Sequence, residues 1–510
     1  MSRSFAQNLS FETNLSSTST ANGAYCLATS GDKLVDLFAS IGALRYSDDS
    51  RNIELFENAL AEDKLLATKI LFYARDIREG LGERKTFRTL LAYSADKHPE
   101  IVMPNINLIG FYGRYDDLYA LVGTKCEDAM WSYMKEQFMM DLANAKLSKP
   151  CSLLAKWIKT PNASSATTKK LGILTSQKLG YKDVGYFKKD LKRLRKYLDI
   201  VEIKITSSNF SEIIYDQVPA KAQRKYGKLF SKKDGDRYSK YLESIEKGEA
   251  KINTSTLYPY DITHKYINSM TYSYSNDCYK ITREIPEEAT LEVLWKNLPN
   301  YIEDGENVLI MADTSGSMVD NVEGLPMAAA LGLAMYFAER VSGDFHNKFM
   351  TFSERPVLQT IVGSTLKEKI NNMATAKWNS NTNLDSAMET LYNTAIKYET
   401  KPEDMPKAIV IISDMQIDSY GGVVRMNETF YEKWSRLFNE AGYKMPNIIF
   451  WNVNSTKNTF HIDAHRKGVQ LLSGYSTSTF KTLLKSLDKT PVETMLGVTL
   501  SERYAPITIG

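Results

Sequence analysis

The chain has 510 residues, which at roughly 100–200 residues per domain suggests two to four domains. Its composition of 43% hydrophobic and 25% charged residues is ordinary for a soluble globular protein, and its four cysteines lack the C-x-x-C spacing of a zinc site. No apolar run reaches the about 18 residues of a membrane span, and the polar start of the chain lacks the apolar core of a secretory signal. We therefore expect a cytoplasmic protein in a reducing compartment, without a membrane partner.

Charge is distributed unevenly along the chain. The whole chain carries a formal net charge of +3, but residues 146–240 hold 23 lysines and arginines against 8 acidic residues, a balance of +15. The remaining residues must then carry −12. This asymmetry indicates a region that binds a polyanion on an otherwise acidic protein. A solvated basic surface without a partner would show the same pattern, so that alternative stays open.

The first 300 residues have the pattern of helices. Residues 1–30 are rich in serine, threonine and asparagine, which predicts an extended arm. Over 31–300 the apolar residues recur at helical spacing, and no strand-like alternation is evident, so we expect an all-α domain. Residues 186–200 predict an amphipathic basic helix. Its apolar stripe consists of Phe187, Leu191, Leu194 and Leu198.

The pattern changes near residue 300, where short, continuously apolar runs alternate with helical segments. Strands are predicted at 307–313, 348–352, 407–414 and 447–453, and helices at 325–340, 364–373, 384–398 and 429–442. Strands that alternate with helices predict a parallel sheet covered on both faces. We therefore expect a second, α/β domain over 301–510 with a Rossmann-like arrangement.

Hard oxygen ligands follow two of the predicted strands. The segment V-L-I-M-A-D-T-S-G-S-M at 308–318 runs from a buried strand into Asp313, and A-I-V-I-I-S-D at 408–414 ends in Asp414. Because ligands bind beyond the carboxyl ends of parallel strands, we expect both carboxylates at one edge of the sheet. Hydroxyl and carboxylate oxygens suit Mg²⁺ or Mn²⁺. The candidate metal ligands are Asp313, Ser315, Ser317, Thr382 and Asp414.

These residues resemble the metal-ion-dependent adhesion site of von Willebrand factor A domains. The family pattern is D-x-S-x-S, then a threonine, then an aspartate, on three loops, and all five positions match. Asn383 departs from the pattern, because many relatives carry an aspartate directly after the threonine. The resemblance implies a site that binds a partner's acidic side chain rather than one that catalyses. The chain also lacks the P-loop string G-x-x-x-x-G-K-[ST], so it is not expected to be an enzyme of that class.

The helical region carries a second resemblance. The segments L-F-Y-A-R-D-I-R-E-G-L-G-E-R at 71–84, G-F-Y-G-R-Y-D-D-L at 110–118 and S-L-L-A-K-W-I at 152–158 are similar to those of the uncharacterised DUF2828 family. That family is in turn similar to the Ro (TROVE) proteins. The resemblance implies a HEAT-like helical domain that can close into a ring with an A domain. It also implies that the chain binds RNA, as single-stranded ends or as small structured RNA.

The basic segment supplies the chemistry that RNA requires. Lysines and arginines bind phosphates, and the aromatic residues among them could stack on bases or belong to helix cores. The candidate RNA-binding residues are Lys188, Lys189, Lys192, Arg193, Arg195, Lys196, Lys232 and Lys233. The main hypothesis is a non-catalytic, Ro-like RNA-binding scaffold with a metal-dependent partner site. The alternative is a protein–protein adaptor or assembly module that uses the metal site without nucleic acid, and a metal-assisted hydrolase is the least favoured.

Overall fold

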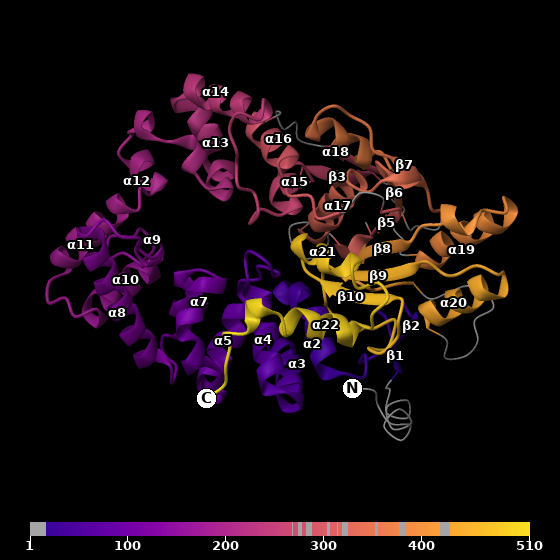
Figure 1. Cartoon of the computed structure of the whole chain (residues 1–510), viewed down its shortest axis with the longest axis horizontal. Coiled ribbons are helices and arrows are strands. Elements are labelled where there is room, and N and C mark those ends of the chain that lie inside the picture. Colours follow the sequence, from indigo (N-terminus) through magenta and orange to yellow (C-terminus); the bar gives the residue numbers. More distant parts are fainter. Residues whose placement is uncertain are drawn as a thin grey trace. The chain divides into compact units, whose positions relative to one another are not determined.

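The chain forms two compact units that are interleaved in sequence. The computed structural model describes residues 17–267, 269–273, 278–281, 288–302, 306–313, 315–318, 325–351, 355–376, 383–418 and 429–510 (Figure 1). The sheet unit comprises Met1–Asp63, Glu79–Leu81 and Asn253–Ser501, and the helical unit comprises Lys64–Arg78, Gly82–Ile252 and Glu502–Gly510. This division differs from the sequence ranges 1–30, 31–300 and 301–510, because each unit takes in segments from distant parts of the chain.

The helical unit is described throughout, and none of its residues forms a strand. Its helices are α4 (Lys64–Arg75), α5 (Lys85–Lys97), α6 (Pro99–Val102), α7 (Ile106–Tyr112), α8 (Glu127–Lys146), α9 (Leu154–Trp157), α10 (Ala166–Lys178), α11 (Val184–Tyr197), α12 (Val201–Thr206), α13 (Ala220–Lys233) and α14 (Gly235–Glu246). A 3₁₀ helix at Tyr115–Leu121 joins α7 to α8. The mostly helical character predicted for this part of the chain is confirmed.

A buried ionic cluster ties the first helices of the helical unit together. Asp117, which is fully buried, accepts hydrogen bonds from Arg75 Nε at 2.7 Å and Arg88 Nε at 2.6 Å. The backbone N–H of Arg114 also donates to Asp117 at 2.9 Å. A Cβ on Gly113 would lie 2.5 Å from the Asp117 carboxylate, so a glycine is required beside this cluster. These arginines are therefore held in tertiary ion pairs rather than presented to a ligand.

The sheet unit contains the central sheet, two short pairs of strands and the helices that flank them. Its elements are β1 (Ser17–Ser19), β2 (Tyr25–Leu27), α2 (Lys33–Ser40), α3 (Asp49–Glu62), α15 (Pro259–Ile267), β3 (Met270–Ser273), β4 (Cys278–Ile281), α16 (Ala289–Lys296), β5 (Val308–Ala312), α17 (Leu325–Ala338), β6 (Lys348–Thr351), β7 (Leu358–Thr360), α18 (Leu366–Ala374), α19 (Leu384–Lys397), β8 (Ala408–Ser413), α20 (Phe430–Glu440), β9 (Asn447–Asn452), β10 (Val469–Ser473), α21 (Ser478–Leu484) and α22 (Pro491–Thr499).

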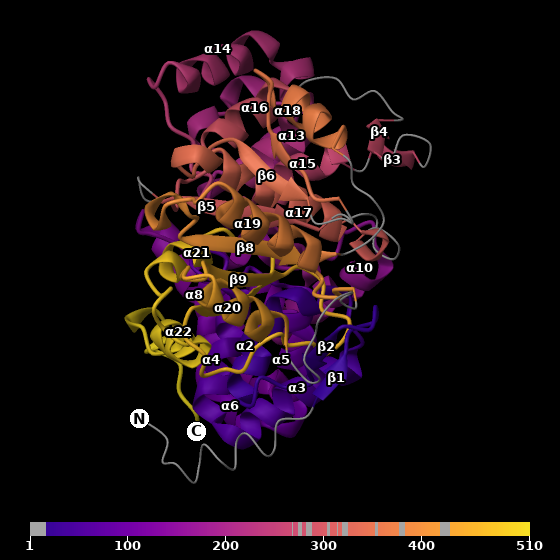
Figure 2. The ribbon, with the colours of Figure 1, turned by 90° about the vertical axis from the view of Figure 1, so that its right-hand side faces the viewer.

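Six strands form the central sheet in the order β10-β9-β8-β5-β6-β7 (Figure 1), and the inner strands β5, β6, β8 and β9 are also labelled in the turned view of Figure 2. All neighbours are parallel except β6 and β7, which pair antiparallel. Read from β7 to β10, the strands occur in the chain order 3-2-1-4-5-6 of a doubly wound sheet, in which the winding reverses between β5 and β8. Both of these strands are buried along their whole length, as their continuous apolar sequences predict.

Helices cover both faces of this sheet. Phe450 and Trp451 are consecutive residues of β9, so their side chains point to opposite faces. Phe450 packs against Phe430 of α20, with the ring centroids 6.2 Å apart. Trp451 packs against Phe337 of α17 at 5.4 Å. The predicted coverage of both faces is therefore present, with α20 on one side and α17 on the other.

Close backbone approaches explain why flanking segments belong to the sheet unit. A Cβ on Gly332 of α17 would lie 2.7 Å from Thr263 Oγ1 of α15, so the two helices pack in direct contact. A Cβ on Gly42 would lie 2.7 Å from the carbonyl carbon of Ser473 at the end of β10. The helix α17 is buried on nearly every side, and α15 supplies the cover that the sheet alone cannot provide.

Two expectations about strands are wrong. The region 31–300 is not all-α, because β3 pairs with β4 in a short antiparallel ladder, and the described part of the arm predicted over 1–30 contains the paired strands β1 and β2. The central sheet is mixed rather than wholly parallel, because β7 runs antiparallel at its edge. These strands have only three or four residues, too few to show the alternation that identifies a strand in a sequence.

Among the residues described, no helix combines the length and the apolar character that crossing a membrane would require.

Candidate functional site

Two buried aspartates meet at the point where the winding of the sheet reverses. Asp313 directly follows β5, and Asp414 directly follows β8. The backbone N–H of Asp313 continues the ladder by donating to the Ile412 carbonyl at 2.9 Å. Each aspartate is only 2% exposed. Because ligands of doubly wound sheets bind at this position, the structure brings the two predicted carboxylates to the place that a ligand requires.

Hydrogen bonds orient the Asp313 carboxylate. The Ser413 hydroxyl donates to Asp313 Oδ2 at 2.6 Å and accepts the N–H of Met415 at 3.0 Å. The N–H of Ser315 donates to Asp313 Oδ1 at 2.8 Å. The Ser315 and Ser317 hydroxyls are hydrogen-bonded to each other at 3.0 Å. Ser315 is buried and Ser317 is exposed, so the hydroxyl pair lies between the buried carboxylates and the surface.

The two carboxylates perturb each other. Burial raises the pKa of Asp313 well above its ordinary range, although hydrogen bonds from Ser413 and Ser315 oppose the shift. Burial and the nearby Asp313 charge raise the pKa of Asp414 to about 7, while hydrogen bonds from Gln416 and Ser317 oppose that shift. Two buried carboxylates that disfavour each other's ionisation need a nearby positive charge to stabilise their ionised forms. A divalent cation would supply that charge.

The N-terminal segment braces the loop that carries Asp414. Gln416 donates its backbone N–H to Asp414 Oδ1 at 3.0 Å. The N–H of Ala21 donates to Gln416 Oε1, and the Asn22 amide donates to the Gln416 carbonyl, both at 2.7 Å. Met415, between the two loop residues, has a left-handed φ of 64°. The turn between β1 and β2 therefore packs on this loop and holds a strained backbone beside the acid.

The third predicted loop is described only in part. Thr382 lies outside the described residues, so its place relative to the two aspartates stays a prediction. Asn383 is the N-cap of α19, and its side chain accepts the N–H of Ser386 at 2.9 Å. Asp385 is buried and accepts hydrogen bonds from Lys433 and from Trp434 Nε1. The asparagine that departs from the family pattern thus has a structural role, and the nearby acid is already neutralised.

The donor set fits a hard divalent cation. Among the described residues, no group of three or more His, Cys, Asp or Glu side chains could hold a metal. A metal here would therefore depend on hydroxyl oxygens together with two carboxylates, which suits Mg²⁺ or Mn²⁺ and not zinc. His461 does not contribute to such a set, because its Nε2 lies within hydrogen-bonding distance of the Met415 carbonyl, at 3.2 Å.

The basic helix α11 forms as the sequence predicts. Asp183 caps its N-terminus, and Phe187, Leu191 and Leu194 form its buried side. Tyr186 is 67% exposed, so the aromatic residues divide between the core and the surface. The exposed cations of this helix are Lys188, Lys189, Lys192, Arg193 and Lys196.

Arg195 differs from its neighbours on α11. Its Nε donates to the Ala155 carbonyl at 2.8 Å, and its Nη2 donates to the Ile158 carbonyl at 3.0 Å. Burial lowers the pKa of this arginine. These bonds fix the end of α9, so Arg195 has a positioning role in the wall of a pocket. Lys232 and Lys233 lie on a different helix, in the last turn of α13, where both are exposed.

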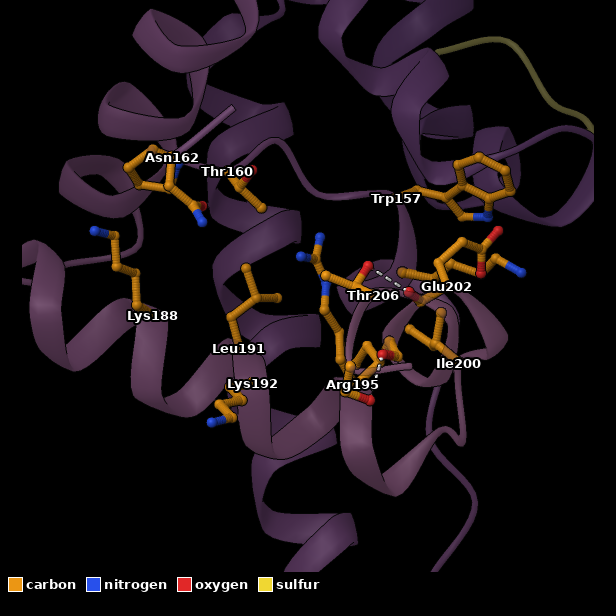
Figure 3. Close-up of a pocket in the computed structure, with 14 residues that line it drawn as sticks. Trp157, Thr160, Asn162, Lys188, Leu191, Lys192, Arg195, Ile200, Glu202 and Thr206 are labelled. Atoms are coloured by element: carbon orange, nitrogen blue, oxygen red, sulfur yellow. Dashed lines mark hydrogen bonds between the residues drawn. The ribbon is translucent and has the colours of Figure 1, made fainter. Parts of the chain in front are cut away.

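A pocket opens beside α11 and lies wholly within the helical unit (Figure 3). Its volume is about 690 Å³, and its walls come from α9, the loop that follows it, α11 and α12. Lys188, Lys192 and Arg195 line it, together with Trp157 and Glu202. A Cβ on Gly172 would lie 2.2 Å from the Thr160 carbonyl carbon, so α10 presses directly on the loop that forms one wall.

Several residues of both sites were not identified from the sequence. Ser413 and Gln416 orient the two aspartates, and the I-I-S-D-M-Q segment could have indicated them only with the strand pairing known. Trp157 and Glu202 lie on helices other than that of the pocket lysines of α11. Their placement depends on how α9 and α12 pack against α11, which no local pattern reveals.

Comparisons with known proteins identify relatives but no activity. A domain of unknown function, DUF7788, matches residues 307–502. An uncharacterized protein of Acanthamoeba polyphaga mimivirus is 27% identical over 94% of this chain and 86% of its own length. The crystal structure of the Ro (RSR) protein of Deinococcus radiodurans is similar over 92% of this chain and 99% of that chain, with a TM-score of 0.46 and 12% identity. The family model of DUF2828, a domain of unknown function, matches residues 20–170 and 149–306. The protein therefore belongs to the DUF2828 family.

Proposed function

We propose that the protein is a non-catalytic scaffold that binds RNA through the helical unit. The observation that carries this proposal is the cationic surface of α11. Five of its lysines and arginines are exposed, and their side chains form no ion pair or hydrogen bond with any described residue. In contrast, the arginines of the Asp117 cluster are paired with buried acids. Unpaired cations on one helix are free to neutralise phosphates.

Salt dependence provides the test of RNA binding. Each phosphate of a single strand contributes about 0.7 to the slope of log affinity against log salt, so engagement of the five α11 cations predicts a slope of about −3 to −4. The measurement is the fluorescence anisotropy of a labelled single-stranded RNA at increasing salt. The nucleic-acid content of the freshly purified protein gives an independent observation. Absence of binding to any RNA at low salt would reject the proposal.

The sheet unit is proposed to hold Mg²⁺ or Mn²⁺ in a site like that of von Willebrand factor A domains. The doubly wound strand order, the two buried carboxylates and the paired serine hydroxyls support this assignment. The residues that would hold the ion are Asp313, Ser315, Ser317, Thr382 and Asp414. The ion would supply an electrophilic centre for an acidic side chain of a partner protein. Mn²⁺ binding by the Ser315→Ala/Asp414→Ala variant at wild-type affinity would contradict the assignment.

The second candidate function is a protein adaptor that binds no nucleic acid. The observation that favours it is the pair of buried carboxylates, Asp313 and Asp414. The two candidates differ in what Asp313→Ala changes. If the adaptor function is the main one, this variant loses a protein partner in a pull-down with Mg²⁺, and no RNA binds to either form. In the proposed scaffold, the same variant keeps its RNA affinity.

We further propose that the protein acts in a reducing, cytoplasmic compartment. Cys26, Cys126 and Cys151 carry free thiols, and burial raises the pKa of each. Thiols with raised pKa values are poor nucleophiles, which also supports a non-catalytic role for these residues.

A further inference from the structure

We propose that the pocket beside α11 holds one unpaired nucleotide of a single-stranded RNA, with its base at Trp157 and Glu202 and its phosphates at Lys188 and Lys192. This inference rests on the proposed RNA-binding function and adds a defined subsite to it. A volume of about 690 Å³ lies within the range of about 300–1,000 Å³ that is usual for small-ligand sites.

The two ends of the pocket differ in chemistry (Figure 3). Lys188 and Lys192 lie one helical turn apart on α11, and both are exposed. Neither forms an ion pair or hydrogen bond with another described residue, so their charge is available to a ligand. In the view of Figure 3, Trp157 and Glu202 lie on the opposite side of the pocket from Lys188. An occupant must therefore be anionic at one end and flat and polar at the other.

Trp157 provides an aromatic surface for a base. Its ring lines the pocket and is half-buried, and the Arg114 guanidinium lies 4.1 Å from the ring centroid. This arginine is itself held by Asp116 through two hydrogen bonds of 2.8 and 2.9 Å. The Lys156 ammonium lies over the same ring at 5.6 Å from its centroid, so a base would stack on the part of the ring that lines the pocket. Leu191 and Ile200 provide the apolar part of the lining.

Glu202 provides an acceptor that lacks a donor. Its Oε2 atom is buried, and no described residue donates a hydrogen bond to it. A buried carboxylate oxygen without a partner is unfavourable. When the Glu202 side chain turns this oxygen toward the pocket that it lines, a ligand that brings an N–H group would stabilise it. The Watson–Crick edge of guanine presents two adjacent N–H donors, which match the two oxygens of a carboxylate. We therefore expect guanine to be the preferred base.

A peptide would satisfy only part of this chemistry, whereas a free nucleotide would satisfy all of it. An acidic peptide could pair with the lysines, but its carboxylates would be repelled by Glu202. A free nucleotide carries the same groups as one residue of a strand, so the two sources must be separated by experiment. The exposed cations of α11 that do not line the pocket, Lys189, Arg193 and Lys196, favour a strand, since they extend the basic surface beyond the pocket.

The test compares two matched double variants in anisotropy titrations with a labelled decamer of uridine that contains one central guanosine. Lys188→Ala/Lys192→Ala removes the pocket lysines, and Lys189→Ala/Lys196→Ala removes two exposed lysines of the same helix that do not line the pocket. At 100 mM salt, about a twofold to threefold loss of affinity is expected for the second variant and at least a tenfold loss for the first. Equal losses in the two variants would overturn the proposal in favour of diffuse surface binding.

The base end is tested separately. The wild type should bind the guanosine-containing decamer more tightly than an all-uridine decamer, and Glu202→Gln should reduce that preference. Equal preference in both proteins would overturn the role of Glu202. Guanosine monophosphate should compete only weakly; competition as strong as that of the decamer would reassign the pocket to free nucleotides. If the wild type binds no RNA at all, the proposed function itself fails, and the outcome is distinct from a failure of the pocket alone.

Discussion

Replacing Asp117 with alanine should destabilise the helical unit strongly. The carboxylate is fully buried and accepts hydrogen bonds from Arg75 at 2.7 Å and from Arg88 at 2.6 Å. Arg88 is also paired with Asp116 at 2.9 Å, so it keeps an acidic partner in the variant. Arg75 is only 2% exposed and would keep its charge in the interior without the partner that now neutralises it. The loss therefore falls mainly on Arg75.

The expected loss of stability follows from leaving the buried Arg75 charge without a partner. Removing one member of a buried ion pair costs about 3–5 kcal/mol, a large part of the about 5–15 kcal/mol by which a typical domain is stable. Removing the stranded charge should then recover stability, so Arg75→Met/Asp117→Ala should be more stable than Asp117→Ala alone. Asp128→Ala serves as the control, because its carboxylate is 96% exposed and pairs with Lys178 on the surface. No measurable loss is expected from that control.

Urea unfolding followed by far-ultraviolet circular dichroism measures these differences. Far-ultraviolet circular dichroism reports the loss of helix, and the helical unit, which is described throughout, consists of helices without strands, so its unfolding changes this signal strongly. A lower urea midpoint with an unchanged slope indicates a change in stability. The reasoning would be refuted if Asp117→Ala lost no more stability than Asp128→Ala. It would also be refuted if removal of Arg75 failed to recover stability, since the uncompensated charge would then not be the cause.

Three further predictions concern pH, metal and packing. Mn²⁺ should bind more tightly as pH rises from about 6 to 8, because the pKa of Asp414 is raised to about 7 and protons then compete with the cation. A constant affinity across this range in calorimetric titrations would contradict the assignment. Burial lowers the pKa of His461 from 6.5 to about 4, so the unfolded state binds a proton at a higher pH than the folded state does. The free energy of unfolding is therefore expected to fall by up to about 3 kcal/mol as pH drops from 6.5 towards 4. His461→Gln should weaken that acid dependence in urea midpoints measured at pH 7 and 4.5, and an unchanged dependence would assign it to other groups. Gly172→Ala should cost about 1–3 kcal/mol by forcing α10 away from Thr160, and it should weaken RNA binding because the pocket wall moves; wild-type affinity in a folded variant would separate that loop from the site.

The local pattern was sufficient for the elements of the central sheet that are long and buried. The strands β5, β8 and β9 and the helices α17, α19 and α20 lie where continuous apolar runs and helical periods predict them. The same is true of α11, whose buried stripe and charged faces follow directly from its sequence. Short edge strands such as β7 could not be predicted, because three residues carry no readable period and the partner strand supplies the stabilisation.

The sequence by itself determined the chemistry of both sites, and the tertiary structure decided which residues share a site. The sequence placed Asp313 and Asp414 after buried strands, and the pairing of β5 with β8 made them neighbours. Conversely, the arginines near residues 75 and 88 are as basic in sequence as those of α11. Only the fold shows that they are neutralised by Asp117. The physical reason is that charge and hydrogen-bonding capacity are local properties, whereas neutralisation and burial depend on partners that the chain brings from far away.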